Sequence, residues 1–381
     1  METRGWIEEA WELGADKVRR ASRRIGARFP HGSHDGHYEL MPPSYWTAGF
    51  WTGLLWLVYR DGAEEELRSI AEQCETQLDP LLMDYACLSH DVGFMWTLSS
   101  LANDRLTGQE ASRRRGLIAA SHLAGRYNPV GRFIRAWNQP ERTGWAIIDC
   151  LMNMPLLYWA SEQTNDPRFR HIAQAHSRTA VEHFLREDGS VRHVVCFDPE
   201  TGRRVGALGG QGYSEHSAWA RGAAWGIYGW TLAFRHTGAA EFREAARRTA
   251  DFFLAHLPED KVPYWDFRLP DCAGAPRDSS AAAIAAGGLL DLADAVEGEA
   301  GELYRQHALS ILRSLSERYR ADETEEAILL HGTGNWPMNQ NVDRPLIYGD
   351  YYYMEALAKC KGNPGLWGPW SGSGGRRTGN G

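Results

Sequence analysis

The chain of 381 residues has few cysteines, no excess of basic residues and no long apolar run, and each deficit excludes a class of protein. Its six cysteines lie far apart without a Cys-x-x-Cys pair, which argues against a zinc knuckle or a disulfide framework. A net charge of −8 argues against binding to nucleic acid or to an anionic membrane, since both require a basic face. The most apolar stretch, Ala281 to Leu290, is too short to cross a bilayer. We therefore expect a cytoplasmic protein, a monomer or weak homodimer, with neither nucleic acid nor membrane as a partner.

Targeting signals and cofactor motifs are also missing. Met1 to Trp6 leads directly into a charged amphipathic pattern, without the apolar core and cleavage site of a secretion signal. The chain has no His-Glu-x-x-His pattern, no phosphate-cradling glycine loop and no Gly-x-Ser-x-Gly elbow, so neither a metal nor a cofactor is expected. Three histidines in one short segment have the density of a metal site, but the small and polar residues between them favour a solvated loop: His31, His34 and His37.

Tryptophan and glycine are abundant, with 16 and 40 residues respectively. Hydrophobic residues make up 43 % of the chain, which excludes a disordered protein, a collagen and a coiled coil. The many indole rings indicate a ligand with flat, carbon-rich faces.

One pattern recurs along the chain: an apolar helix rich in glycine and aromatic residues, a short turn, and a helix charged on one face. A helix that is apolar all round is buried on every side, whereas a striped helix packs against a core with its back to water. The apolar helices are expected to begin near residues 46, 93, 145, 219, 280 and 349.

Six such pairs predict an all-α fold, a single (α/α)6 barrel of six inner and six outer helices over residues 1–370. The sixth outer helix is expected to be the N-terminal one, about Ile7 to Ile25, closing the ring beside the last inner helix. Residues 371–381 are expected to form a flexible tail. The inner helices then run parallel, and their N-termini gather at one mouth, where the positive dipole ends favour an anion.

Two aspartates near these helix starts are candidates for acid–base chemistry. Asp149 lies in an otherwise apolar stretch, where burial raises the pKa of a carboxyl and keeps a proton available near neutrality. The structural alternative is an aspartate that pairs with an arginine or caps a neighbouring helix. Asp91 precedes a helix start, so considered alone it favours capping. Together the two form the carboxylate pair that glycosidic chemistry uses.

Aromatic and polar residues near the same helix starts are candidates for sugar binding. Trp137 and Trp219 are expected to stack on a sugar ring, whereas Trp51 is assigned to the core. A buried Arg221 needs an anionic partner, and a protein carboxylate and a substrate carboxylate are equally compatible with the sequence. The candidates for contact with a sugar are Trp46, His90, Trp137, His193, Gln211, Trp219, Arg221 and Trp225.

Several sequence blocks follow one another in a characteristic order: residues 46–53, 90–94, 147–153, 217–226, 264–267, 277–281 and 348–353. In these blocks the chain resembles the unsaturated glucuronyl hydrolases of glycoside hydrolase family 88. The resemblance extends over about Trp46 to Leu357, nearly the whole chain.

The resemblance implies an (α/α)6-barrel enzyme that removes a 4,5-unsaturated uronic acid from the non-reducing end of lyase-generated oligosaccharides, glycosaminoglycan-type or related. It also implies that Asp149 is the general acid/base and Asp91 a second essential carboxylate. By the same resemblance, five of the candidates for sugar contact line the substrate pocket: His193, Gln211, Trp219, Arg221 and Trp225. The acid protonates C4 of the enol-ether double bond, water adds at C5, and the resulting hemiketal opens and expels the aglycone. The expected partner is a disaccharide-sized unsaturated uronyl oligosaccharide.

Three departures from the family pattern leave open the neighbouring sugar, its linkage and the tolerance of sulfate: Ala48, Ala223 and the pair Glu215-His216. Three other functions compete with the family assignment. They are an unsaturated rhamnogalacturonyl hydrolase of family 105, a sugar epimerase on the same barrel and a non-catalytic sugar-binding barrel. Residues 147–150 favour family 88 over family 105, and the presence of both aspartates argues against a simple binder.

Overall fold

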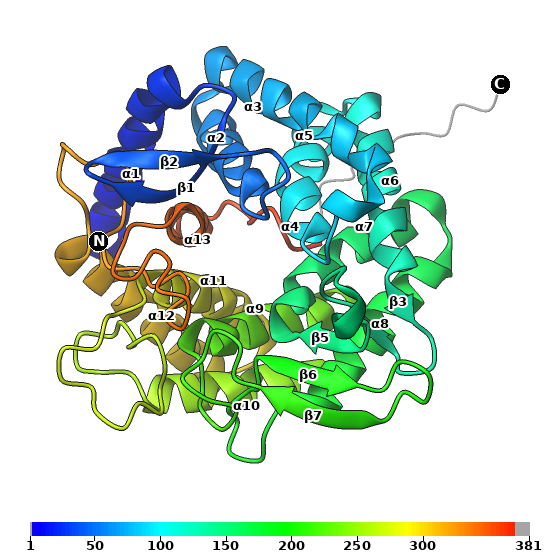
Figure 1. The fold of residues 1–381 in the computed structure, drawn as a ribbon. Helices are drawn as coiled ribbons and strands as arrows, with labels where there is room; N and C mark the ends of the chain where they lie inside the picture. The colour runs from blue at the N-terminus through cyan, green and yellow to red at the C-terminus, as the bar shows by residue number, and fades with distance from the viewer. Residues whose placement is uncertain (1, 370–381) are drawn as a thin grey trace.

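Helices form a closed ring around a buried centre (Figure 1), in a computed structural model that describes residues 2–369. The expected (α/α)6 barrel is confirmed, because inner and outer helices alternate along the chain from α1 onward. The predicted flexible tail, residues 371–381, lies outside the described residues.

The helix starts predicted at residues 46, 93, 219, 280 and 349 fall within two residues of the observed ones. The inner ring contains α2 (Ala48–Gly62), α4 (Val92–Trp96) continued through the π-helical turn η3 (Thr97–Leu101) into α5 (Ala102–Thr107), α7 (Met154–Thr164), α9 (Ala220–Thr237), α11 (Ser279–Ala295) and α13 (Ile347–Cys360). The outer ring contains α1 (Glu2–Ile25), α3 (Glu65–Gln77), α6 (Glu110–Gly125), α8 (Pro167–His183), α10 (Ala240–Ala255) and α12 (Glu299–Arg318).

The inner helices are apolar all round because each is surrounded by other helices. In α11 every residue from Ser279 to Ala293 is buried. Asp278 starts this helix, since its carboxylate accepts hydrogen bonds from the backbone N–H groups of Ser280 and Ala281 at 3.1 and 3.3 Å. Glycine allows neighbouring inner helices to approach closely: a Cβ at Gly49 in α2 would collide with a backbone carbonyl of α4.

The ring closes where the first helix meets the last one, as the sequence predicts. α1 packs beside α13. Lys17 of α1 also donates hydrogen bonds to the carbonyl oxygens of Asp322, Glu325 and Ala327 at 2.6, 2.7 and 2.8 Å. These bonds join residues 305 to 310 positions apart. The two ends of the chain therefore stabilise each other.

The predicted start of the third inner helix at Trp145 is wrong, because α7 begins only at Met154. The chain first forms strand β5 (Trp145–Ile147), then the 3-10 helix η5 (Ile148–Asn153), and only then α7. β5 pairs antiparallel with β6 (Val194–Phe197), which in turn pairs with β7 (Arg204–Leu208). A run of isoleucine and valine residues fits such a pleated, buried surface better than a helix start.

The predicted loop around His31 is wrong, because the segment folds into a β-hairpin. β1 (Phe29–His34) pairs with β2 (His37–Met41) through a turn at Asp35 and Gly36, both with positive φ. His31 is buried, with its ring 4.8 Å from that of Tyr45. A second small hairpin joins β3 (Tyr127–Asn128) and β4 (Phe133–Ile134). The short 3-10 helices η1 (Asp79–Met83), η2 (Tyr85–Cys87) and η4 (Pro140–Arg142) lie in the connections.

Candidate active site

Asp149 lies in η5, at the mouth where the inner helices begin. The Ile148 backbone N–H donates to the carbonyl oxygen of His193 at 3.0 Å, which fixes this turn against the start of β6. Burial raises the pKa of the Asp149 carboxyl to about 7; the Arg221 guanidinium opposes this rise, and the negative charge of Asp91 adds to it. Oδ2 of Asp149 accepts no hydrogen bond from residues 2–369. The structural alternatives for Asp149, an arginine pair or a helix cap, are therefore not supported at this oxygen.

His193 is the polar group facing that oxygen. Its Nε2 lies 3.5 Å from Oδ2 of Asp149, and its Nδ1 accepts a hydrogen bond from the backbone N–H of Gln211 at 2.8 Å. Burial lowers the pKa of His193 to about 3, so the ring is neutral near pH 7. The Gln211 N–H at Nδ1 favours the neutral tautomer with its proton on Nε2, the ring nitrogen nearest Oδ2 of Asp149.

Asp91 occupies the N-cap position of α4, but its side chain makes no capping hydrogen bond. Its carboxylate instead accepts from Oγ of Ser89 at 2.8 Å and lies 3.3 Å from Nε2 of His90. The capping role that the position alone favoured is thus not observed. The negative charge of Asp91 also raises the pKa of Asp149, so the two carboxylates are near enough to interact through their charges.

Arg221, at the start of α9, is almost fully buried and is paired with a protein carboxylate. Its Nη1 lies 2.6 Å from Oδ2 of Asp278, and Nη2 donates to Oε1 of Gln211 at 2.7 Å. The carbonyl oxygens of Thr333 and Gly334 accept the remaining bonds from the same two nitrogens, at 2.6 and 2.5 Å. Of the two partners left open by the sequence, the structure shows the protein one.

The predicted aromatic residues surround these polar groups. The Trp219 ring lies 4.3 Å from that of His193 and 4.6 Å from the Arg221 guanidinium carbon. Trp137 is half-buried with its ring 6.3 Å from that of His90, and Trp46 is half-buried beside α2. Trp225 and Trp51 are fully buried, and the assignment of Trp51 to the core is confirmed.

Two residues near the site were not among the predicted site residues. Tyr348 has its ring 5.1 Å from Trp46 and 5.2 Å from the Arg221 guanidinium carbon. Asp278 neutralises Arg221 while it caps α11. Both residues lie in the blocks that carry the family resemblance, so their sequence position was the available signal.

A second buried aspartate shows what distinguishes Asp149. Burial raises the pKa of Asp350 to about 7 as well. Asp350, however, accepts hydrogen bonds from the Tyr38 hydroxyl and from the backbone N–H groups of Ile328 and Leu329, the latter two at 2.7 and 2.9 Å. Asp350 is saturated with donors and serves the fold, whereas Asp149 has an oxygen without one.

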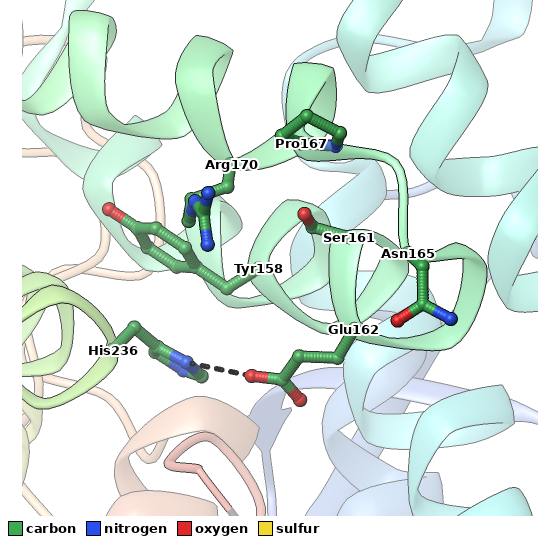
Figure 2. Close-up of a pocket in the computed structure, with 7 residues that line it drawn as sticks. All are labelled: Tyr158, Ser161, Glu162, Asn165, Pro167, Arg170 and His236. Carbon is green, nitrogen blue, oxygen red and sulfur yellow. Dashed lines mark ion pairs between the residues drawn. The ribbon is translucent and has the colours of Figure 1, made fainter.

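A hollow of about 400 Å³ lies at the opposite end of the barrel, where α7 and α9 end and α8 begins (Figure 2). In it the His236 ring stacks on Tyr158 at 4.6 Å, and its Nδ1 lies 3.7 Å from Oε1 of Glu162. None of the predicted site residues lines this hollow. The candidate residues predicted from the sequence lie instead at the mouth where the inner helices begin.

Residues 2–369 offer neither a metal site nor a membrane-spanning helix. No group of three or more His, Cys, Asp and Glu side chains in this range is arranged to hold a metal ion. No helix in the same range is both long enough and apolar enough to cross a bilayer. All six cysteines are free.

Comparison with known proteins gives consistent relatives, although no family model matches the chain. The unsaturated glucuronyl hydrolase of Bacillus sp. GL1 is 39 % identical over 355 residues, 91 % of this chain and 94 % of the relative. Its crystal structure matches with a TM-score of 0.92, at 36 % identity over 95 % of this chain and 99 % of that one. The unsaturated chondroitin disaccharide hydrolase of Streptococcus pyogenes is 37 % identical over 93 % of this chain and 90 % of its own length. A mutant unsaturated glucuronyl hydrolase of Streptococcus agalactiae, complexed with dGlcA-GalNAc6S, matches with a TM-score of 0.83 at 35 % identity, covering 93 % of this chain and 91 % of that one.

Proposed function

The chain belongs to the unsaturated glucuronyl hydrolases of glycoside hydrolase family 88, and on that premise we propose that Asp149 is its general acid and Asp91 its second essential carboxylate. The enzyme is a glycosidase that releases 4,5-unsaturated glucuronic acid from the non-reducing end of oligosaccharides. The names of its relatives favour this activity over that of a rhamnogalacturonyl hydrolase or an epimerase. The observation that carries the proposal for Asp149 is its buried Oδ2, which makes no hydrogen bond within residues 2–369 and lies 3.5 Å from Nε2 of His193.

The first step transfers a proton from the Asp149 carboxyl to C4 of the sugar. The electron pair of the C4=C5 double bond forms the new C4–H bond, and positive charge develops at C5, shared with the ring oxygen. A carboxyl with a pKa near 7 is suited to this step because it holds its proton at neutral pH and still gives it up readily.

Water then adds at C5, and its proton returns to the Asp149 carboxylate, which restores the acid. The product is a hemiketal whose C5–OH becomes a carbonyl as the C5–O bond of the ring breaks. The former ring oxygen takes up a proton and becomes a hydroxyl on C1, which also bears the aglycone oxygen and is therefore a hemiacetal. The hemiacetal collapses to an aldehyde and expels the aglycone as an alcohol. Asp91 supports these steps by holding the substrate and the water with a carboxylate that Ser89 orients at Oδ2 and His90 at Oδ1.

The surrounding residues provide the walls of the pocket. Trp137, which is half-buried, offers a ring face for a flattened sugar, and Trp219 is buried against His193 and Arg221 as a wall behind them. Gln211 offers a side chain fixed by Arg221. The Arg221–Asp278 pair is neutral as a unit, so we propose that it orients neighbouring groups in addition to any direct contact with the uronate. Trp46, His90, His193 and Trp225 complete the proposed binding set.

The substrate class that we propose is an unsaturated disaccharide derived from a glycosaminoglycan. Two relatives support it: one is a chondroitin disaccharide hydrolase, and the other was solved in complex with dGlcA-GalNAc6S. We also propose a cytoplasmic location, since six free cysteines suit a reducing compartment, and a monomer or weak homodimer as the active form.

An ultraviolet assay tests this proposal. Incubation of the enzyme with an unsaturated chondroitin or hyaluronan disaccharide is expected to abolish the absorbance of the conjugated acid and to release a free amino sugar. A lyase would raise the absorbance, and an epimerase or a binding protein would leave it unchanged. A panel of sulfated and unsulfated glycosaminoglycan, ulvan, gellan and pectin disaccharides, compared by kcat/KM, identifies the natural substrate. Preference for a pectin disaccharide would contradict the proposed substrate class.

The pH dependence of kcat/KM provides a second test. Since Asp149 must carry its proton, kcat/KM is expected to fall about tenfold per pH unit above pH 7. The folded-state pKa values of Asp149 and Asp350 are both raised, so their contribution to stability is lost between the ordinary aspartate pKa, about 4, and about 7, and changes little at higher pH. Circular dichroism over the same range separates loss of the acid from unfolding. A rate that stays constant to pH 9 in a folded protein would contradict the role of Asp149.

A further inference from the structure

His90 lies beside Asp91 and is almost fully buried, with 1 % of its surface exposed. Its Nε2 is 3.3 Å from Oδ1 of Asp91, and its Nδ1 is 3.3 Å from the side-chain amide nitrogen of Asn153. A neutral imidazole has one N–H and one acceptor nitrogen, so these two neighbours decide where the proton resides. Burial lowers the pKa of His90, which keeps the ring neutral near pH 7.

The orientation of the Asn153 amide is fixed by a group that only donates. The backbone N–H of Phe94 in α4 donates to Oδ1 of Asn153 at 2.7 Å. The amide oxygen therefore faces α4, and the NH2 group faces His90. Asn153 is fully buried at the end of η5, against Gly93, where a Cβ would collide with it. This tight packing leaves the amide no room to turn over.

We infer that Asn153 is a positioning residue that selects the Nε2–H tautomer of His90 and thereby holds the Asp91 carboxylate in its reactive orientation. The inference rests on the proposed role of Asp91. Asn153 donates to Nδ1, the proton resides on Nε2, and Nε2–H points at Oδ1 of Asp91. In the opposite tautomer two lone pairs would face each other, and Asp91 would keep only its bond from Ser89.

The same logic applies on the other side of the site, with a backbone group in place of a side chain. The Gln211 N–H occupies Nδ1 of His193 and leaves its Nε2–H toward Asp149. Each of the two carboxylates thus faces a neutral imidazole whose tautomer depends on the donor at its Nδ1. Of these two donors only the one at His90 belongs to a side chain, so a single substitution can reverse the tautomer of His90 but not that of His193.

Nitrogen-15 NMR of the histidine rings in the intact protein tests the inference directly. In the wild-type enzyme His90 is expected to show a protonated Nε2 and an unprotonated Nδ1. Asn153→Asp keeps the shape and still accepts from Phe94, but it places a second acceptor against Nδ1. In that variant Nδ1 of His90 is expected to become protonated. A wild-type His90 protonated on Nδ1 overturns the inference whether or not any variant folds.

Kinetics distinguish positioning from a merely structural role. Asn153→Asp and Asn153→Leu are expected to lower kcat about 10- to 100-fold, as loss of such supporting hydrogen bonds typically does, with KM changed only a few-fold. Asn103→Leu is the matched control: Asn103 is equally buried in α5, where it donates to Glu75 at 2.7 Å, away from the site. It is expected to lose stability but to keep both kcat and the His90 tautomer. Full kcat in folded Asn153→Leu overturns the inference, whereas failure of the wild-type enzyme to consume the double bond would refute the proposed function and leave the NMR result standing.

Discussion

Asparagine in place of Asp149 is expected to lower kcat by about 10⁴-fold, the upper end of what a general acid contributes, while the barrel stays folded. The amide has nearly the shape of the carboxyl but has no acidic proton to give to C4. Neither neighbour replaces it, because His193 is neutral and Arg221 is already paired. The loss of absorbance of an unsaturated disaccharide, followed in single turnovers, measures this step. An active Asp149→Asn enzyme would refute the assignment of the acid.

Stability provides the control for that substitution. Because burial raises the pKa of Asp149 to about 7, its ionisation destabilises the folded state at higher pH. The melting temperature of Asp149→Asn, relative to that of the wild type, is therefore expected to be higher at pH 8 than at pH 6. Asp350→Asn is the contrasting variant. There the new NH2 group would face a hydroxyl or backbone donor, so the melting temperature should fall.

The second large effect is expected from Asp278→Asn, which leaves Arg221 buried without its anion. The free energy of unfolding should drop by about 3–5 kcal/mol, as for other broken buried ion pairs. The cap of α11 survives, because Oδ1 of the amide still accepts from Ser280 and Ala281. Activity should fall as well, since Arg221 would no longer be fixed against Gln211. Urea unfolding and the absorbance assay measure the two effects.

Two further variants test whether the expected loss of stability arises from the burial of Arg221 and not from the loss of an ion pair as such. Glu241→Gln removes the partner of Arg178 in a pair whose side chains are 44 % and 51 % exposed, and about 1 kcal/mol or less is expected. The double variant Arg221→Met, Asp278→Asn removes both buried charges and should recover part of the lost stability but none of the activity. An Asp278→Asn protein as stable as the wild type would show that Arg221 does not depend on this carboxylate.

Much of the barrel can be predicted from the sequence because a fully buried helix is apolar along its whole length and around its whole circumference. The stretches beginning near Trp46, Trp219 and Ser280 are apolar around their circumference, and such a pattern leaves few alternatives to an inner helix. The same reasoning identified the N-terminal helix as the missing outer one. These predictions depend on composition over fifteen or more residues, where single exceptions average out.

The errors arose where tertiary pairing overrides local pattern. Trp145 begins a strand because β6, some fifty residues later, offers a partner, and no local feature reveals that partner. His31 is buried in a hairpin because Tyr45 and Tyr348 pack against it. The Asp-Gly pair at residues 35 and 36 was the available signal for the hairpin turn.

Some features of the site could likewise be predicted from the sequence, and others depend on the fold. That Asp149 is buried could be predicted from its apolar neighbours, and its pKa follows from burial. That one of its oxygens has no donor could not be predicted, because this depends on what β6 and α9 place around it. The partner of Arg221 stayed open for the same reason, since Asp278 lies 57 residues away. Local chemistry can be predicted from local sequence, whereas the completeness of a hydrogen-bond network requires the fold.

The closure of the ring by α1 and α13 has a consequence for synthesis on the ribosome. α1 is the first helix to emerge, yet Lys17 finds its carbonyl acceptors only after more than 300 further residues have been made. Until then the face of α1 that packs on α13 stays exposed to water, in a chain that is otherwise largely folded. A circular permutant that joins the present ends and opens the chain between α3 and η1 would let α13 and α1 emerge in succession. Because the order of emergence matters only during synthesis, the permutant should aggregate less than the natural order in cell-free translation.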